Sequence, residues 1–68
     1  MNLTIELDRE VDGRWIAEVP ELNVLLYGVS REDAIQKAEE AAREIIADRI
    51  QRRTLPASAI DATFAVSV

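Results

Sequence analysis

The chain has 68 residues, of which 31% are charged, and a formal net charge of -5 at pH 7. We expect residues 1–68 to form a single domain, because so short a chain cannot close two separate hydrophobic cores. It contains no cysteine and no histidine, which excludes disulfides, thiolate metal sites and the commonest general base. The acidic balance disfavours direct nucleic-acid binding and favours a basic partner. No apolar run is long enough for a membrane span, so we expect a cytoplasmic protein without membrane contact.

Apolar and polar residues alternate over residues 3–8 and again over residues 14–19, as in strands with one buried face. The two strands are expected to form a hairpin, and the alternation decides its loop. A two-residue turn at Asp12-Gly13 would put apolar and charged residues on the same face. A loop over residues 11–13, with Gly13 left-handed, aligns the apolar sets instead. It pairs Leu7 with Ala17, Arg9 with Trp15 and Glu10 with Arg14.

A third strand is predicted at residues 24–27, after Pro20 ends the second strand because proline cannot donate to a ladder. This strand is apolar on both faces, and one helix is too little material to cover both. Burial of a hydrophobic core of this size also contributes a free energy only about equal to the entropy cost of ordering the chain. We therefore expect a homo-oligomer in which another chain covers this strand. The place of Trp15 in the apolar set of the alternation favours a core position over an interface, whereas Tyr27 fits either position.

A helix is predicted from Ser30, a good N-cap with Asp33 three residues on, to about Arg53. Val29 is expected to pack against Ala34 as a hydrophobic staple. The helix presents small apolar residues at three- and four-residue spacing, which lets it lie close to a sheet. This apolar stripe consists of Ala34, Ile35, Ala38, Ala41, Ala42, Ile45, Ile46 and Ile50.

Leu55-Pro56 is expected to stop the helix, and alternation over residues 60–68 predicts a last strand. A right-handed crossover through the helix would place this strand beside the first and parallel to it. The predicted fold class is therefore α+β, strand-strand-strand-helix-strand, with a four-stranded mixed sheet of order 3-2-1-4 and one long helix on one face.

The chemistry available to this chain is limited to carboxylates. Glu6, Asp8 and Glu18 fall on the polar sheet face and Asp61 could join them, so an acidic metal cluster is conceivable. A solvated face of an acidic protein explains the same pattern without chemistry. No compact metal motif or phosphate-binding glycine loop is present, so we expect no catalytic residue, no cofactor and no metal. Arg49, Arg52 and Arg53 could form a basic patch, but their place at the helix end explains them.

Two stretches of the chain form a motif whose spacing runs from Gly13 through Pro20 to Gly28 and Ala34. They are Asp12-Gly13-Arg14-Trp15-Ile16-Ala17-Glu18-Val19-Pro20-Glu21-Leu22 and Tyr27-Gly28-Val29-Ser30-Arg31-Glu32-Asp33-Ala34-Ile35. This motif resembles that of the HicB antitoxin family, and the likeness spans roughly residues 3–50.

The resemblance implies a degenerate ribonuclease H-like domain without nuclease activity. Such a domain binds a small basic messenger-RNA-cleaving toxin of the HicA family and covers its active site. Family members usually carry Pro-Gly where Asn23-Val24 stands here, and they append a DNA-binding module, which is not expected here because the sequence ends at Val68 after its last strand. The resemblance therefore carries over toxin binding and not DNA binding.

The leading hypothesis is a protein-binding antitoxin-like domain of a type II toxin–antitoxin system. An acidic domain suits a basic toxin. One alternative is a stand-alone HicB-like homo-oligomer with a structural or regulatory role and no toxin, and another is a vestigial metal-dependent nuclease. The residues expected at the partner or oligomer interface are Glu18, Glu21, Val24, Leu25, Leu26 and Tyr27.

Overall fold

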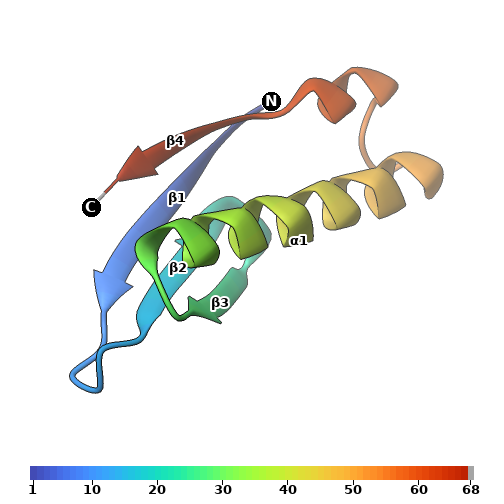
Figure 1. Cartoon of the computed structure of the whole chain (residues 1–68). Coiled ribbons are helices and arrows are strands. Elements are labelled where there is room, and N and C mark those ends of the chain that lie inside the picture. Colours follow the sequence, from blue (N-terminus) through green and yellow to red (C-terminus); the bar gives the residue numbers. More distant parts are fainter. Residues whose placement is uncertain (68) are drawn as a thin grey trace.

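The computed structural model describes residues 1–67 and has an α+β fold. A four-stranded sheet has the order β3-β2-β1-β4, and one helix, α1, packs on one of its faces (Figure 1). β1 runs antiparallel to β2 and parallel to β4, which confirms the predicted mixed sheet and its order. The elements are β1 (Asn2–Arg9), β2 (Trp15–Val19), β3 (Val24–Gly28), α1 (Arg31–Gln51) and β4 (Thr63–Ser67), with short 3-10 helices at Pro20–Leu22 and Ala57–Asp61.

The β1–β2 hairpin has the register predicted from the alternation. Leu7 lies opposite Ala17, and Arg9 lies opposite Trp15. Gly13 closes the loop with φ of +94°, a left-handed conformation that glycine adopts without a side-chain clash. The guanidinium carbon of Arg9 lies 5.6 Å from the centre of the Trp15 ring, and Trp15 is half-buried against the core. The parity argument therefore identified the loop correctly.

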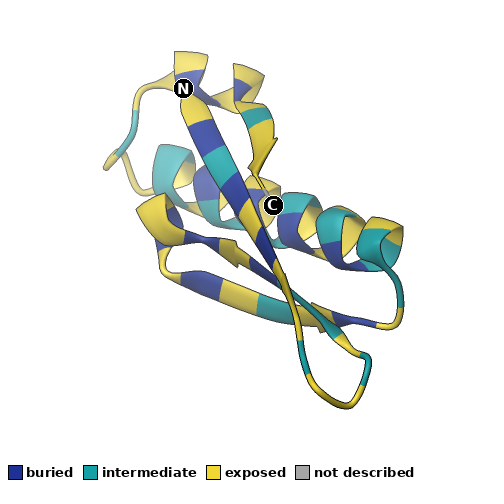
Figure 2. Cartoon of the chain, turned by 90° about the vertical axis from the view of Figure 1, so that its left-hand side faces the viewer, coloured by how far each residue is buried: buried dark blue, intermediate teal, exposed yellow. Residues whose placement is uncertain are grey.

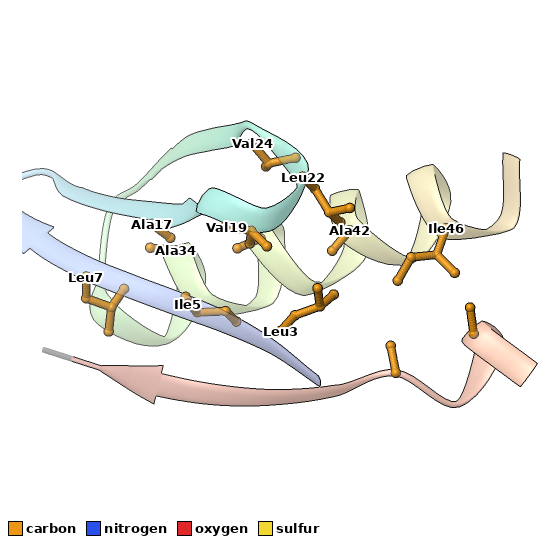
Figure 3. Close-up of a cluster of buried hydrophobic side chains, with 13 residues drawn as sticks. Leu3, Ile5, Leu7, Ala17, Val19, Leu22, Val24, Ala34, Ala42 and Ile46 are labelled. Carbon is orange, nitrogen blue, oxygen red and sulfur yellow. The ribbon is translucent and has the colours of Figure 1, made fainter. Parts of the chain in front are cut away.

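The hydrophobic core fills the space between α1 and the inner face of the sheet (Figure 3). Figure 2 shows the alternation of buried and exposed residues along β1 that this one-sided burial produces. The predicted stripe of α1 faces the core. Its buried members are Ala34, Ala38, Ala42 and Ile46, and its partly buried members at the margins are Ile35, Ala41, Ile45 and Ile50. The buried residues are Leu3, Ile5, Leu7, Ala17, Val19, Leu22, Val24, Ala34, Ala38, Ala42, Ile46, Ala59 and Ala62.

The start of α1 lies very close to the end of β3. A Cβ placed on Gly28 would be 2.4 Å from the backbone nitrogen of Ala34, which is closer than real side chains approach. Ser30 caps the helix, since its Oγ accepts the N–H of Asp33 at 3.0 Å. The predicted staple from Val29 is wrong, because that side chain is 85% exposed. Its backbone N–H is instead bound by the Asp33 carboxylate at 3.1 Å.

The helix ends two residues before the predicted position. Arg53 takes a left-handed conformation, with φ of +62°. The N–H of Thr54 then donates to the carbonyl of Arg49 at 2.9 Å, and the N–H of Arg53 to that of Ile50 at 3.0 Å. This is the hydrogen-bond pattern of a Schellman cap, with arginine at the position where glycine is usual. The cap, rather than Pro56, stops the helix.

The last strand begins at Thr63 and not at Ile60. Residues 57–61 form a 3-10 helix because the N–H of Ala59 turns back to the carbonyl of Pro56 at 3.0 Å. Ile60 is consequently exposed, and Asp61 lies ahead of the strand rather than on it. The final predicted strand residue, Val68, lies outside the described residues.

The helix does not cover the sheet evenly. It packs chiefly on β3 and β2, touches β1 much less and barely reaches β4 (Figure 1). The inner side of β4 is therefore more open than that of β3. Within residues 1–67, no helix is long and apolar enough to cross a membrane.

Candidate protein-binding surface

The face of the sheet that points away from α1 carries an apolar strip across β2 and β3. Leu25 and Tyr27 point outward from β3 and are 50% and 44% exposed, respectively. Ile16 lies opposite Tyr27 on β2 and is half-buried. We call these three residues the outer patch. Apolar side chains of this size on an otherwise polar sheet face are typical of a surface that another molecule covers.

Carboxylates border the outer patch on the β1 side. The backbone register places Asp8 opposite Ile16, and Glu18 lies between Leu25 on one side and Glu6 on the other. These side chains enclose a shallow hollow of about 330 Å³ together with Ile16, Leu25 and Leu7. Like charges directly opposite each other, as Glu6 and Glu18 are, disfavour the isolated sheet. A cationic partner would relieve that repulsion.

A cation covers the other end of the patch. The guanidinium carbon of Arg14 lies 4.6 Å from the centre of the Tyr27 ring. Arg14 is held there by Asp12, whose carboxylate accepts the Nε–H of Arg14 at 2.8 Å. Asp12 also accepts the backbone N–H of Arg14, and this hydrogen bond is the main cause that lowers the pKa of the Asp12 carboxyl. The hairpin loop thus holds the Arg14 guanidinium over the ring of Tyr27.

Glu21 serves a structural role at the end of β2. Pro20 begins a 3-10 turn in which its carbonyl accepts the N–H of Asn23 at 3.3 Å, and the nearby Thr4 N–H donates to both Glu21 carboxylate oxygens, at 3.1 and 3.2 Å. The backbone N–H groups of Glu21 itself and of Thr4 lower the pKa of this carboxyl below its ordinary value of 4.5. The next turn is completed by Asn23 in the left-handed region, with φ of +57°, which asparagine tolerates well.

Replacing Glu21 by glutamine should therefore make the free energy of unfolding less dependent on pH in the acidic range. Because the folded-state pKa is lowered, the ionised carboxylate stabilises the fold above the ordinary pKa, and this contribution is lost as pH falls through the lowered value. We expect Glu21→Gln to lower the free energy of unfolding at pH 7, and we expect this difference from the native chain to disappear at a pH below the lowered pKa. Urea denaturation at pH 7 and at such an acidic pH measures this. Glu44→Gln, on the exposed side of α1, is the control and should change little at either pH.

The structure brings together three of the six residues expected at the interface. Glu18, Leu25 and Tyr27 share the outer face, whereas Val24 lies in the core at 9% exposure. Leu26 also points inward, where it is half-buried against the core. Adjacent residues of a strand face opposite sides, so no single face can present the whole segment. Val24 and Leu26 therefore do not belong to the outward-facing surface, and the Glu21 carboxylate is engaged with the Thr4 N–H.

Sequence reasoning missed the contribution of Ile16. In the alternation it falls on the polar side of β2, between Arg14 and Glu18. The signal was available, because an isoleucine on a polar face stands out once the strand is aligned with Tyr27 on β3. Finding it required the β2–β3 register, which the uniformly apolar third strand does not specify.

The acidic metal cluster considered from the sequence does not form around Asp61. That residue belongs to the 3-10 helix ahead of β4. Across residues 1–67, no three acidic side chains lie close enough together to hold a metal ion. No family model matches this chain, and no curated protein or solved structure is significantly similar to it.

Proposed function

We propose that this chain is a HicB-like antitoxin domain with a degenerate ribonuclease H-like fold that binds a small basic RNA-cleaving toxin and covers its active site. The observation that carries the proposal is the outer patch, an exposed apolar strip beside a row of carboxylates. The HicB-like residues of the hairpin and helix start support the choice of partner. One of them, Gly13, makes the loop that positions Arg14 on Tyr27.

The physical argument concerns both affinity and choice of partner. Leu25 and Tyr27 offer apolar area whose burial stabilises a complex, and tyrosine is among the residues that contribute most at the centre of an interface. Glu6, Asp8 and Glu18 at the margin attract a basic surface and repel an acidic one, including RNA. Binding by occlusion needs no catalytic group on this chain.

The test uses a short basic protein encoded beside this chain's gene, expressed with it and purified as the partner. We expect the native chain to bind that protein and to suppress its cleavage of RNA. Leu25→Lys should weaken binding by at least about tenfold, or 1.4 kcal/mol, because it places a cation at the centre of the patch. Isothermal titration calorimetry and an RNA-cleavage assay measure the two effects.

Ile60→Lys is the matched control, since Ile60 is 55% exposed on the 3-10 helix outside the patch. It should bind the partner as tightly as the native chain does. If both lysine variants weaken binding equally, the effect is one of net charge and the outer patch is not the binding site. If the neighbouring protein cleaves RNA undisturbed by the native chain, the antitoxin function is rejected.

A second candidate is a HicB-like homo-oligomer with a structural or regulatory role and no toxin. The sheet's two edge strands favour it, because neither Val24–Gly28 nor Thr63–Ser67 carries a charged residue. Uncharged edges are unusual in proteins that stay monomeric. The absence of a gene for a basic neighbour, together with a stable oligomer in sedimentation, would favour this candidate.

A further inference from the structure

The edge of the sheet at β4 presents backbone groups to solvent in a defined pattern. The N–H of Thr63 donates to the carbonyl of Met1 at 2.9 Å, so the backbone of Thr63 faces β1. In a strand, successive residues direct their N–H and C=O groups to opposite sides, and Ala65 and Ser67 therefore also face β1. The N–H and C=O groups of Phe64 and Val66 point to the open edge.

The same strand has an uncovered apolar side. α1 barely reaches β4, and Val66 is 43% exposed on the side that faces the helix layer. Phe64 is half-buried, with the guanidinium carbon of Arg43 5.1 Å from its ring centre. β3 differs, because α1 closes its inner side and leaves Val24 in the core. Of the two edges, β4 alone combines free backbone groups with open apolar side chains on the core side.

We propose that a second copy of this chain pairs with β4 in antiparallel fashion, about a twofold axis at Ala65, so that two four-stranded sheets become one. In this register Phe64 lies opposite Val66 of the partner subunit, and by symmetry Val66 lies opposite Phe64 of the partner subunit. Ala65 lies opposite its own copy, and Thr63 lies opposite Ser67 of the partner subunit. The proposal does not depend on the proposed antitoxin function.

The geometry selects both the occupant and the register. The groups that point to the edge belong to Phe64 and Val66, which lie symmetrically about Ala65, so two copies satisfy one another completely. A shift of two residues in either direction would leave half of these groups without a partner within residues 63–67. Each copy also places an aromatic ring beside a β-branched side chain, a favourable cross-strand pair.

Charge and side-chain size agree with pairing at this edge. β4 reads Thr-Phe-Ala-Val-Ser, so two copies meet without like charges in opposition. Its outward residues, Thr63, Ala65 and Ser67, are small and uncharged, so they place neither bulk nor charge between the two copies. Five residues from each copy make a smaller interface than the roughly 20 to 30 a side of a standard one, so we expect a dimer in the micromolar range.

Single cysteines test the register directly, since the native chain has none. Ala65→Cys would face its own copy in a non-hydrogen-bonded pair, with Cα atoms about 4.5 Å apart and within the range of a disulfide. Ser67→Cys is the matched control on the same face. Its own copy would be about 13 Å away, roughly four residues along a strand and beyond the disulfide range. Under mild oxidation, we expect Ala65→Cys to form a covalent dimer at least about tenfold faster.

Analytical ultracentrifugation supplies the independent measurement. We expect the native chain to dimerise reversibly, and Val66→Lys to raise the dimer dissociation constant at least about tenfold, because a lysine on an edge strand opposes pairing. Leu25→Lys should leave dimerisation unchanged, while Val66→Lys should leave binding of the basic partner unchanged. Circular dichroism checks that both variants fold.

The outcomes separate the two proposals. Equal cross-linking of the two cysteine variants, or a native chain that stays monomeric at several hundred micromolar, would overturn the β4 dimer and leave the antitoxin proposal standing. Loss of dimerisation in Leu25→Lys with none in Val66→Lys would also overturn it, and would place self-association at the β3 side. A β4 dimer that ignores the basic neighbour supports this proposal alone.

Discussion

The substitution Ile5→Ala is expected to lower the free energy of unfolding by about 2 to 5 kcal/mol relative to the native chain. Ile5 is fully buried on β1, beneath α1 and between the neighbouring strands (Figure 3). Truncation removes buried methyl groups and leaves a cavity that the surrounding backbone cannot fill. A domain of 68 residues has a total stability of roughly 3 to 10 kcal/mol, so this one change could unfold much of the population.

Urea denaturation at 25 °C measures this loss, and Ile60→Ala is the matched control. Ile60 is 55% exposed on the 3-10 helix, and its truncation should change the unfolding free energy by less than about 0.5 kcal/mol. An isoleucine should therefore contribute strongly to stability at position 5 and almost nothing at position 60. Similar losses in both variants would mean that the core is not centred on β1.

Gly28→Ala is expected to cost about 3 kcal/mol, at the upper end for overpacking. The added Cβ would meet the backbone nitrogen and Cα of Ala34 at 2.4 and 2.6 Å. These are backbone atoms of the first helical turn, so relief requires a shift of α1 away from β3 and from the alanines packed beneath it. The penalty arises from lost packing along the helix and not from backbone conformation at position 28.

The substitution Gly13→Ala tests the effect of backbone conformation in the absence of a steric clash. Gly13 has φ of +94°, but an added Cβ there meets nothing within 4 Å. Its cost should be only about 1 to 2 kcal/mol, the strain of an L-residue in the left-handed region. Thermal and chemical denaturation of the two variants should therefore rank Gly28→Ala as the more damaging. The opposite ranking would show that α1 can slide on the sheet without loss.

The two proposed surfaces occupy different parts of one sheet, a face and an edge. The outer patch lies across β2 and β3, and the dimer contact lies on β4, with β1 between them. A dimer joined at β4 would carry its two outer patches at the far ends of the combined sheet. Each copy could then bind a partner without displacing the other, which is why the variants Leu25→Lys and Val66→Lys should act independently.

Much of the fold follows from local patterns in the sequence. Alternation with period two identifies β1 and β2, and it decides the loop at Gly13 because only one parity aligns their apolar sets. The stripe from Ala34 to Ile50 identifies α1. The boundaries after Ile50 were less accurate, because the arginine cap at position 53 and the 3-10 turn after Pro56 depend on backbone conformations that composition does not reveal.

The sequence by itself determined the order of elements, the strand order of the sheet and the acidic character of its outer face. Only the tertiary structure decided which side chains of β3 are core and which are surface. An alternating strand declares its buried face, but Val24 to Tyr27 is apolar throughout, so its facing comes from the register with β2. The placement of α1 over β3 and β2, with β4 left open, is likewise a packing result, because a helix rests where small residues such as Gly28 and Ala34 permit the closest approach.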